Sequence, residues 1–473
     1  MPGAMRRRIR FIALLVPLLF GALACKAITQ AWAPHNPPTL PAVVISPSPT
    51  AFVIPTDTST PAPTSTPLPS PTPLPPTPTP SPIPTVTSQP TASIQQLQVF
   101  EELWKTVKDN YLYRDFNGLD WDAVHVEYRQ KIEAGLTEEE FYQAMDEMIY
   151  RLGDDHSIFL SPQSAAEEDA HQAGDYDYVG IGVLNEVVPE RRLVTIILVF
   201  PGSPAEKAGL AIHDSILAVD GQPVVDENGF RQDLLRGPEG TKITLTVRTP
   251  GQAPRQVEIT RRRINSGLPV PHSLLTTPGG KRVGYLLLAS FEDSTIGNQV
   301  RKALQELTKD GPLDGVILDN RENGGGVNTA FSDTLGFFTK GLLGYFVNRQ
   351  EQDPLRILGE DIKGSQSVPL VVLVGSGTAS FGEIFSGILQ DTGRAYIMGQ
   401  TTDGNVEILW IYTFRDGSRL WLAHDTFRPL NHPDANWELS GIIPDQVAKS
   451  SWDEVTLETD PVVAAALQHF DSH

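Results

Sequence analysis

The spacing of hydrophobic and polar positions along this 473-residue chain changes several times, and each change predicts a different structure. The strongest pattern begins with a continuous apolar run at 370–374, followed by small residues and then by apolar residues at helical spacing. We expect a buried strand over 370–374, a helix that begins near Phe381 and ends at Thr392, and a second strand over 395–398. Ser380 then lies where a strand passes into a helix.

Three further patterns divide the remainder of the folded chain. Apolar residues recur at helical spacing between residues 94 and 160, which predicts a helical segment that we bound at 94–170. Short strands alternate with turns over 175–265. From 266 to 473 strands and helices alternate, as in an α/β sheet. The chain is therefore expected to be a multidomain α+β protein.

The first 25 residues have the pattern of an export signal. Four arginines precede an apolar run over 11–23, which is too short for a comfortable membrane span. The run is followed by Cys25, the only cysteine of the chain, and this arrangement resembles a bacterial lipobox, whose cysteine is lipidated. We expect an exported protein held at the outer side of a bacterial membrane by a lipid on Cys25. The alternative is an ordinary cleaved signal with an unrelated cysteine.

Residues 26–93 are expected to form a stalk. Most of this stretch repeats proline, threonine and serine, a composition that buries no core and favours extended, solvated chain. It would separate the folded part from a membrane.

The composition excludes several kinds of binding partner and metal site. The formal net charge of −20 argues against a nucleic-acid partner, and a single cysteine excludes internal disulfides and cysteine metal sites. We expect no metal and no cofactor, and polypeptides as the partners; the sequence does not indicate an oligomeric state.

Ser380 is a candidate nucleophile. At the start of a helix the first N–H groups lack intrahelical partners, so they can stabilise the oxyanion that forms when a hydroxyl attacks a carbonyl. A glycine run that follows the predicted strand 315–318 also permits close backbone approach. The simpler alternative is that Ser380 only caps the helix.

The segment over 175–265 closely resembles a PDZ domain. An opening loop, the stretch SPAEKAGL and the stretch DSILAVDG follow one another in the order of that family. The resemblance implies that a peptide adds as a strand beside the opening loop, formed here by Val179, Gly180, Ile181 and Gly182, whose N–H groups hold a C-terminal carboxylate. The alternative is a PDZ domain that only packs as a lid.

The ordered set of helical segment, PDZ domain, LDNRENGGG and TASFGEI before QDTGRA resembles the carboxyl-terminal-processing (tail-specific) serine peptidases over about residues 95 to 450. This resemblance implies a C-terminal peptidase core of the crotonase-like ββα type, with Ser380 as the nucleophile. It also implies an oxyanion hole formed by Gly325 or Gly326 together with the N–H of Phe381.

One position departs from that family. Its serine usually pairs with a lysine base, and Asn405 occupies the matching position 25 residues after Ser380. An asparagine amide cannot act as a base near neutral pH. Two interpretations remain: a catalytically silent PDZ receptor or scaffold that binds peptides, or a peptidase that uses another base.

The second interpretation rests on a resemblance to the tricorn-like members, which use serine, histidine and glutamate. The segment DDHS places His156 at the matching histidine, and NWELSGIIPD places Glu438 at the glutamate. An imidazole near its ordinary pKa of about 6.5 can accept the proton of Ser380, and Glu438 would orient the serine or the substrate. His156 as a purely structural histidine is equally open, and His424 is a weaker candidate base.

Overall fold

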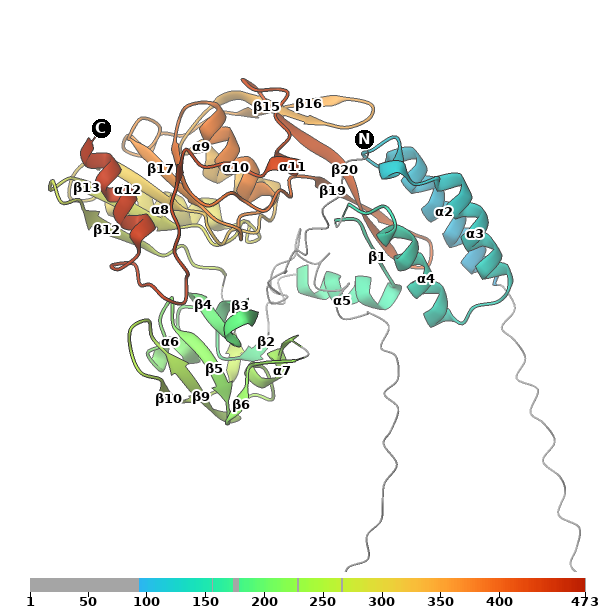
Figure 1. The fold of residues 1–473 in the computed structure, drawn as a ribbon, viewed down its shortest axis with the longest axis horizontal. Helices are drawn as coiled ribbons and strands as arrows, with labels where there is room; N and C mark the ends of the chain where they lie inside the picture. The colour runs from blue at the N-terminus through green and yellow to red at the C-terminus, as the bar shows by residue number, and fades with distance from the viewer. Residues whose placement is uncertain (1–92, 155, 173–177, 228, 265–266, 473) are drawn as a thin grey trace, which may run out of the picture. The chain divides into compact units, whose positions relative to one another are not determined.

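The computed structural model describes residues 93–154, 156–172, 178–227, 229–264 and 267–472 (Figure 1). The predicted export signal, Cys25 and the stalk up to residue 92 lie outside these residues. No helix within the described ranges combines the length and the apolar character needed to cross a membrane.

The N-terminal segment is helical, as expected, and has its own apolar core. Ser93 and Thr137 begin α2 and α4 with reciprocal capping boxes, because each side chain accepts an N–H three residues later. The last residues of the expected helical pattern instead form a short strand, because they pair with a strand from the far end of the chain. The elements are α2 (Ile94–Asn110), η1 (Phe116–Gly118), α3 (Trp121–Glu133), α4 (Glu138–Tyr150), β1 (Ile158–Leu160) and α5 (Pro162–Gln172).

The next segment is the PDZ-like unit. Its main sheet has the order β10-β9-β5-β4-β3 with β6 beside β5, and β2 pairs separately with β11. Its strands are β2 (Tyr178–Gly180), β3 (Val183–Val188), β4 (Leu193–Val199), β5 (Ser215–Val219), β6 (Gln222–Pro223), β7 (Val225–Asp226), β8 (Gly229–Phe230), β9 (Lys242–Arg248), β10 (Arg255–Thr260) and β11 (Arg262–Ile264). Its helices are η2 (Pro189–Arg191), α6 (Pro204–Lys207) and α7 (Gln232–Leu235).

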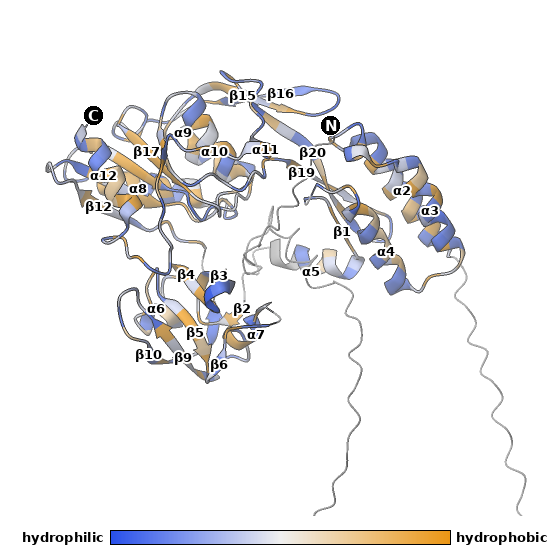
Figure 2. Ribbon diagram, viewed as in Figure 1, coloured by the Kyte–Doolittle hydropathy of each residue, from blue (hydrophilic) through white to orange (hydrophobic). Residues whose placement is uncertain are grey.

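The C-terminal segment is built on a six-stranded sheet with the order β12-β13-β14-β17-β18-β21. The strands from β13 to β21 are parallel, and the inner ones read as continuous apolar runs because both faces are buried (Figure 2). The elements are β12 (His272–Thr276), β13 (Arg282–Leu287), α8 (Ile296–Leu307), β14 (Gly315–Asp319), α9 (Asn328–Gly336), β17 (Leu370–Val374), α10 (Phe381–Asp391), β18 (Tyr396–Gly399), β21 (Gln446–Val447) and α12 (Pro461–Ser472).

A second sheet connects the C-terminal segment to the N-terminal helices. The long strand β20 pairs with β15 through its end and with β1 and β19 through its beginning. It therefore connects the C-terminal segment to the strand that follows His156 (Figure 1). The strands are β15 (Gly341–Val347), β16 (Gln352–Ile357), β19 (Ile408–Thr413) and β20 (Arg419–Pro429), and the one-turn helix α11 (Trp437–Ser440) follows.

Candidate active site

Ser380 lies in a strained turn between β17 and α10. Its backbone has φ 52° and ψ −128°, a conformation that a residue with a side chain rarely adopts. Its side chain makes no capping hydrogen bond, and its hydroxyl bonds to none of the described residues. Ser380 therefore occupies the N-cap position of α10 without capping the helix through its side chain, and the hydroxyl is left available.

The glycine loop after β14 lies directly against this serine. At Gly325, where φ is 97°, a Cβ would stand 2.7 Å from the Cβ of Ser380 and 3.1 Å from the nitrogen of Phe381. The N–H of Gly325 donates to the side-chain oxygen of Asn323 at 2.9 Å. The N–H groups of Gly326 and Phe381 donate to no group in the described ranges, so these two are the better candidates for an oxyanion hole.

Hydrogen bonds lock the glycine loop to the serine turn. The carbonyl of Asn323 accepts the N–H of Ala379 at 2.9 Å, and the amide of Asn320 donates to the carbonyl of Gly382 at 2.8 Å. The hydroxyl of Thr378 donates to the carbonyl of Asn320 at 2.7 Å. These bonds fix the two segments that follow neighbouring parallel strands, β14 and β17, at one edge of the sheet.

Glu383, which the sequence interpretation overlooked, holds a third segment against Ser380. Its buried carboxylate accepts the hydroxyl of Thr402 and the N–H groups of Gly404 at 2.9 Å and Asn405 at 2.7 Å. Burial raises the pKa of Glu383 to about 7, and the three donors act against that rise. The carbonyl of Asn405 then accepts the N–H of Ser380 at 2.6 Å.

Asn405, at the position of the usual lysine, contacts both neighbouring segments through main-chain hydrogen bonds. Its N–H bonds to Glu383 and its carbonyl to Ser380. Its side-chain amide is buried and makes no hydrogen bond with any residue that the structure describes. This side chain supplies no base.

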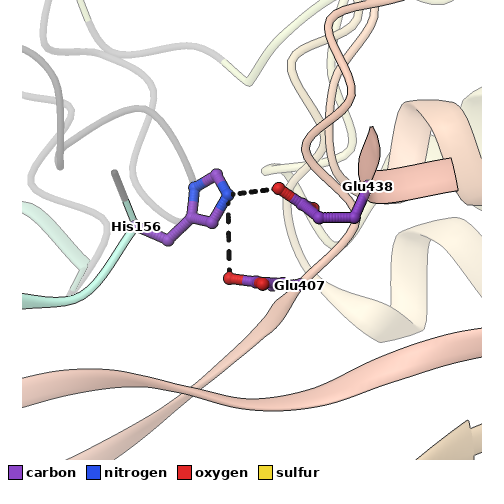
Figure 3. Close-up of side chains that lie close together, drawn as sticks. All are labelled: His156, Glu407 and Glu438. Atoms are coloured by element: carbon purple, nitrogen blue, oxygen red, sulfur yellow. Dashed lines mark hydrogen bonds and ion pairs between the residues drawn. The ribbon is translucent and has the colours of Figure 1, made fainter. Parts of the chain in front are cut away.

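His156 is brought together with two glutamates, and Figure 3 shows both carboxylates facing the same ring nitrogen. Its Nε2 lies 3.0 Å from Oε1 of Glu438 and 3.7 Å from Oε2 of Glu407. Glu438 belongs to α11, and Glu407 immediately precedes β19. The sequence interpretation identified His156 and Glu438 by resemblance but gave no sign of Glu407.

The negative surroundings change the protonation of His156. Burial disfavours its charged form, but the hydrogen bond with Glu438 and the charges of Glu407, Glu438 and Asp154 outweigh burial and raise the pKa of His156 to about 9. The expectation of an ordinary imidazole pKa is therefore wrong. Burial likewise raises the pKa of Glu407 to about 8, against the opposing charge of His156.

Residues 405 and 406 connect the histidine cluster to the serine turn. Ser380 bonds to the carbonyl of Asn405, and the next residue, Val406, donates its N–H to Oε2 of Glu438 at 2.8 Å. Among the described residues no hydrogen bond joins His156 to the hydroxyl of Ser380. Apo structures often show catalytic contacts that close only around a substrate, so this separation does not exclude a role as base.

His424 has other partners. Its Nδ1 lies 3.0 Å from Asp425, and its ring stacks on Trp410 with 3.9 Å between centroids. No contact among the described residues joins it to Ser380, so it is the poorer candidate base.

The predicted carboxylate loop opens the PDZ-like unit. Val179 and Gly180 belong to β2 and pair with β11, while the carbonyls of Ile181 and Gly182 accept N–H groups of Ala205 and Phe200. The N–H of Ile181 donates to no described residue, whereas the N–H of Gly182 faces the hydroxyl oxygen of Tyr178. One donor therefore remains in this loop for a carboxylate.

The PDZ-like unit also reaches the glycine loop. Glu186 of β3 and Glu322, three residues before Gly325, are both half-buried and lie close to each other. Burial and the charge of Glu322 raise the pKa of Glu186 well above its usual range, and burial raises that of Glu322. No sequence motif predicted this pair.

Comparison with known families agrees with this organisation. Residues 282–448 match the model of peptidase family S41, residues 95–150 that of the tricorn protease C1 domain, and residues 195–249 that of a PDZ domain.

Known proteins resemble the chain over most of its length. It is 32% identical to a carboxyl-terminal-processing protease of Synechocystis sp. over 80% of this chain and 87% of that one. It is 31% identical to a protein of the same name from a Picosynechococcus species, over 73% and 81%. A solved structure of a photosystem II D1 C-terminal processing protease is similar with a TM-score of 0.55 and 29% identity, over 79% of this chain and 97% of that one.

Proposed function

The chain belongs to peptidase family S41 and is a serine peptidase of the carboxyl-terminal-processing type, and from this premise we propose that it cleaves polypeptides with Ser380, His156 and Glu438. Ser380 is the nucleophile and His156 the general base. Glu438 is a positioning residue that holds the imidazole.

The proposed reaction is an acyl transfer. The oxygen of Ser380 attacks the scissile carbonyl while its proton passes to His156, directly or through one water, and the N–H groups of Gly326 and Phe381 stabilise the oxyanion. The imidazolium then protonates the leaving amine, and an acyl-enzyme remains on Ser380. Water, activated by the neutral His156, hydrolyses this ester and restores the hydroxyl.

The observation that carries this proposal is the strained turn at Ser380. A strained backbone that places a serine hydroxyl without a capping hydrogen bond beside two unused N–H groups costs free energy, about 1–3 kcal/mol, and such strain clusters at active sites. The hydrogen bond between His156 and Glu438 supports the choice of base.

A fluorophosphonate probe tests the nucleophile directly. The wild-type chain should be labelled on Ser380 and should cleave unstructured peptides, because only an activated serine reacts with this probe. Ser380→Ala should lose both the label and at least about 10³-fold in kcat/KM. A wild-type protein that neither reacts with the probe nor cleaves any member of a peptide library would leave the peptide-binding scaffold as the better function.

We also propose that the PDZ-like unit binds the C-terminus of the substrate. The N–H of Ile181, which donates to no described residue, supports this role. With the Ser380→Ala chain, a peptide that ends in a free apolar residue should bind more tightly than the same peptide with an amidated C-terminus. Equal affinities would exclude carboxylate recognition.

The location remains a proposal from the sequence. We propose that the protein is exported and anchored by a lipid on Cys25. Cys25→Ser should then release the protein from the membrane fraction and remove a lipid mass from the intact protein. A variant that still pellets with membranes, together with a wild type that carries no lipid mass, would contradict the anchor.

A further inference from the structure

The cluster around His156 has the composition of a metal site. One ligand atom each from His156, Glu407 and Glu438 lie within 4.8 Å of one another, and Figure 3 shows that they face a common centre. We propose that these three side chains bind a zinc ion that inhibits the peptidase. The inhibition rests on the function proposed above for His156, whereas the binding does not depend on it.

The distances suit a tetrahedral ion. Zinc bonds of about 2.0–2.2 Å to nitrogen and carboxylate oxygen separate neighbouring ligand atoms by roughly 3.3–3.5 Å. The two measured separations, 3.0 Å from His156 to Glu438 and 3.7 Å to Glu407, lie on either side of that value. The Glu407 and Glu438 oxygens lie within 4.8 Å of each other, so the two carboxylates would move toward the ion to complete three corners of the tetrahedron.

Glu407 supplies an independent indication of a ligand. Glu407 is only 4% exposed. Its Oε2, the atom that faces His156, is buried and has no hydrogen-bond partner among the described residues. Its other oxygen accepts the hydroxyl of Tyr113. A buried carboxylate oxygen without a donor is costly, and a cation beside it removes that cost.

The neighbours orient these ligands as a metal site requires. The hydroxyl of Tyr113 fixes Glu407, and the N–H of Val406 donates to the second oxygen of Glu438 at 2.8 Å. Such outer partners hold ligating carboxylates in place and strengthen binding. The two carboxylate ligands are thereby held by groups that do not themselves compete for the ion.

The donor set selects the ion. One imidazole nitrogen and two carboxylates match zinc, whereas calcium and magnesium take six or more ligands, mainly oxygen. Two carboxylates also neutralise a divalent charge in this buried place. The side chain of Glu438 is 15% exposed, against 6% for His156, so it offers the route of access and a position for a water as fourth ligand.

Zinc at this site would stop proton transfer. An imidazole that has given its lone pair to a metal and stands beside a divalent charge cannot accept the proton of Ser380. The same ion would hold Glu438 away from its positioning role. The site therefore couples zinc concentration to peptidase activity.

Calorimetric titration of zinc chloride into metal-free Ser380→Ala chain measures binding without any need for activity. We expect one zinc per chain, no binding of calcium or magnesium, and at least about a tenfold loss of zinc affinity in Ser380→Ala with Glu407→Gln. Glu306→Gln in the same background is the matched control, because Glu306 forms a similar pair with His272 at 3.0 Å that no third potential ligand among the described residues joins. It should leave the affinity unchanged.

Peptide cleavage by the wild type supplies the second measurement. Zinc should inhibit it, a chelator should reverse the inhibition, and the Glu407→Gln variant should need at least about ten times more zinc. No zinc binding, or equal affinity with and without Glu407, overturns the site and leaves the base assignment untouched. Binding that depends on Glu407 but does not slow cleavage overturns the inhibitory role and removes His156 as the base.

Discussion

The Ser380 turn and the His156 cluster are connected by residues 405 and 406, and they are held together by different kinds of contact. The serine turn is held mainly by backbone groups of segments that follow neighbouring strands, and its oxyanion donors are main-chain N–H groups. The histidine cluster consists of three side chains from separate parts of the chain. The proposed nucleophile thus depends on the peptidase core, whereas the proposed base depends on the pairing of β1 with β20.

Two buried glutamates show the same contrast. Glu383 accepts three hydrogen bonds and fastens the segment of Asn405 to α10, so its carboxylate has a structural task. Glu407 accepts one hydrogen bond and leaves an oxygen without a donor beside His156. A satisfied carboxylate stabilises a fold, and an unsatisfied one indicates a place for a proton or a cation.

The largest effect should follow from removal of the base. His156→Ala should lower kcat about 10³-fold, because general-base catalysis contributes about 10²–10⁴. Peptide binding by the Ser380→Ala, His156→Ala double variant should equal that of Ser380→Ala alone, since the PDZ-like loop is untouched. Steady-state kinetics and peptide titration give both values; full activity in His156→Ala would mean that the serine turn obtains its base elsewhere.

A substitution in the glycine loop tests how far catalysis depends on the backbone around the Ser380 turn. Gly325→Ala should lower kcat about 10²-fold and the free energy of unfolding by about 1–3 kcal/mol, because a Cβ would meet Ser380 and the backbone has positive φ. Gly280→Ala is the control, since its φ of 87° carries the same strain but nothing lies within 4 Å. If both variants retain equal activity, contact with Ser380 is unimportant.

The pH dependence sharpens the role of the glutamates. A base with a pKa of about 9 should make kcat/KM, measured with a chelator present, rise as the pH increases through about 9. Glu438→Gln removes the hydrogen bond that most raises the pKa of His156, so the rise should move to lower pH while the maximal rate falls about 10–100-fold. An unchanged pH profile of kcat/KM in this variant would mean that a group other than His156 causes the observed rise.

The smallest effect is expected at Asn405. Because its contacts with Ser380 and Glu383 use only main-chain atoms, Asn405→Ala should change kcat/KM by no more than about threefold. Thr401→Ala, a nearby exposed position, serves as the control. A loss of more than about 100-fold would assign the amide of Asn405 a direct part in catalysis.

Much of the peptidase core could be predicted from local pattern. The expected strand 370–374 and the helix start at Phe381 agree with β17 and α10, because a buried parallel strand and an amphipathic helix both require a characteristic spacing of apolar residues. The interpretation of 158–160 as helical was wrong. Those residues form β1 because β20, more than 250 positions later, supplies the hydrogen bonds.

The sequence by itself determined the family and the PDZ-like unit, and it indicated Ser380 as the candidate nucleophile, since each depends on residues close together in the chain. Only the tertiary structure decided which N–H groups of the serine site are free, that Glu407 joins His156 and Glu438, and that the pKa of His156 rises. These properties depend on burial and on charges brought together from distant segments. The local spacing of residues does not predict burial or the charges that distant segments bring together. A buried charge acts on groups within a few ångströms of it, whatever their positions in the sequence.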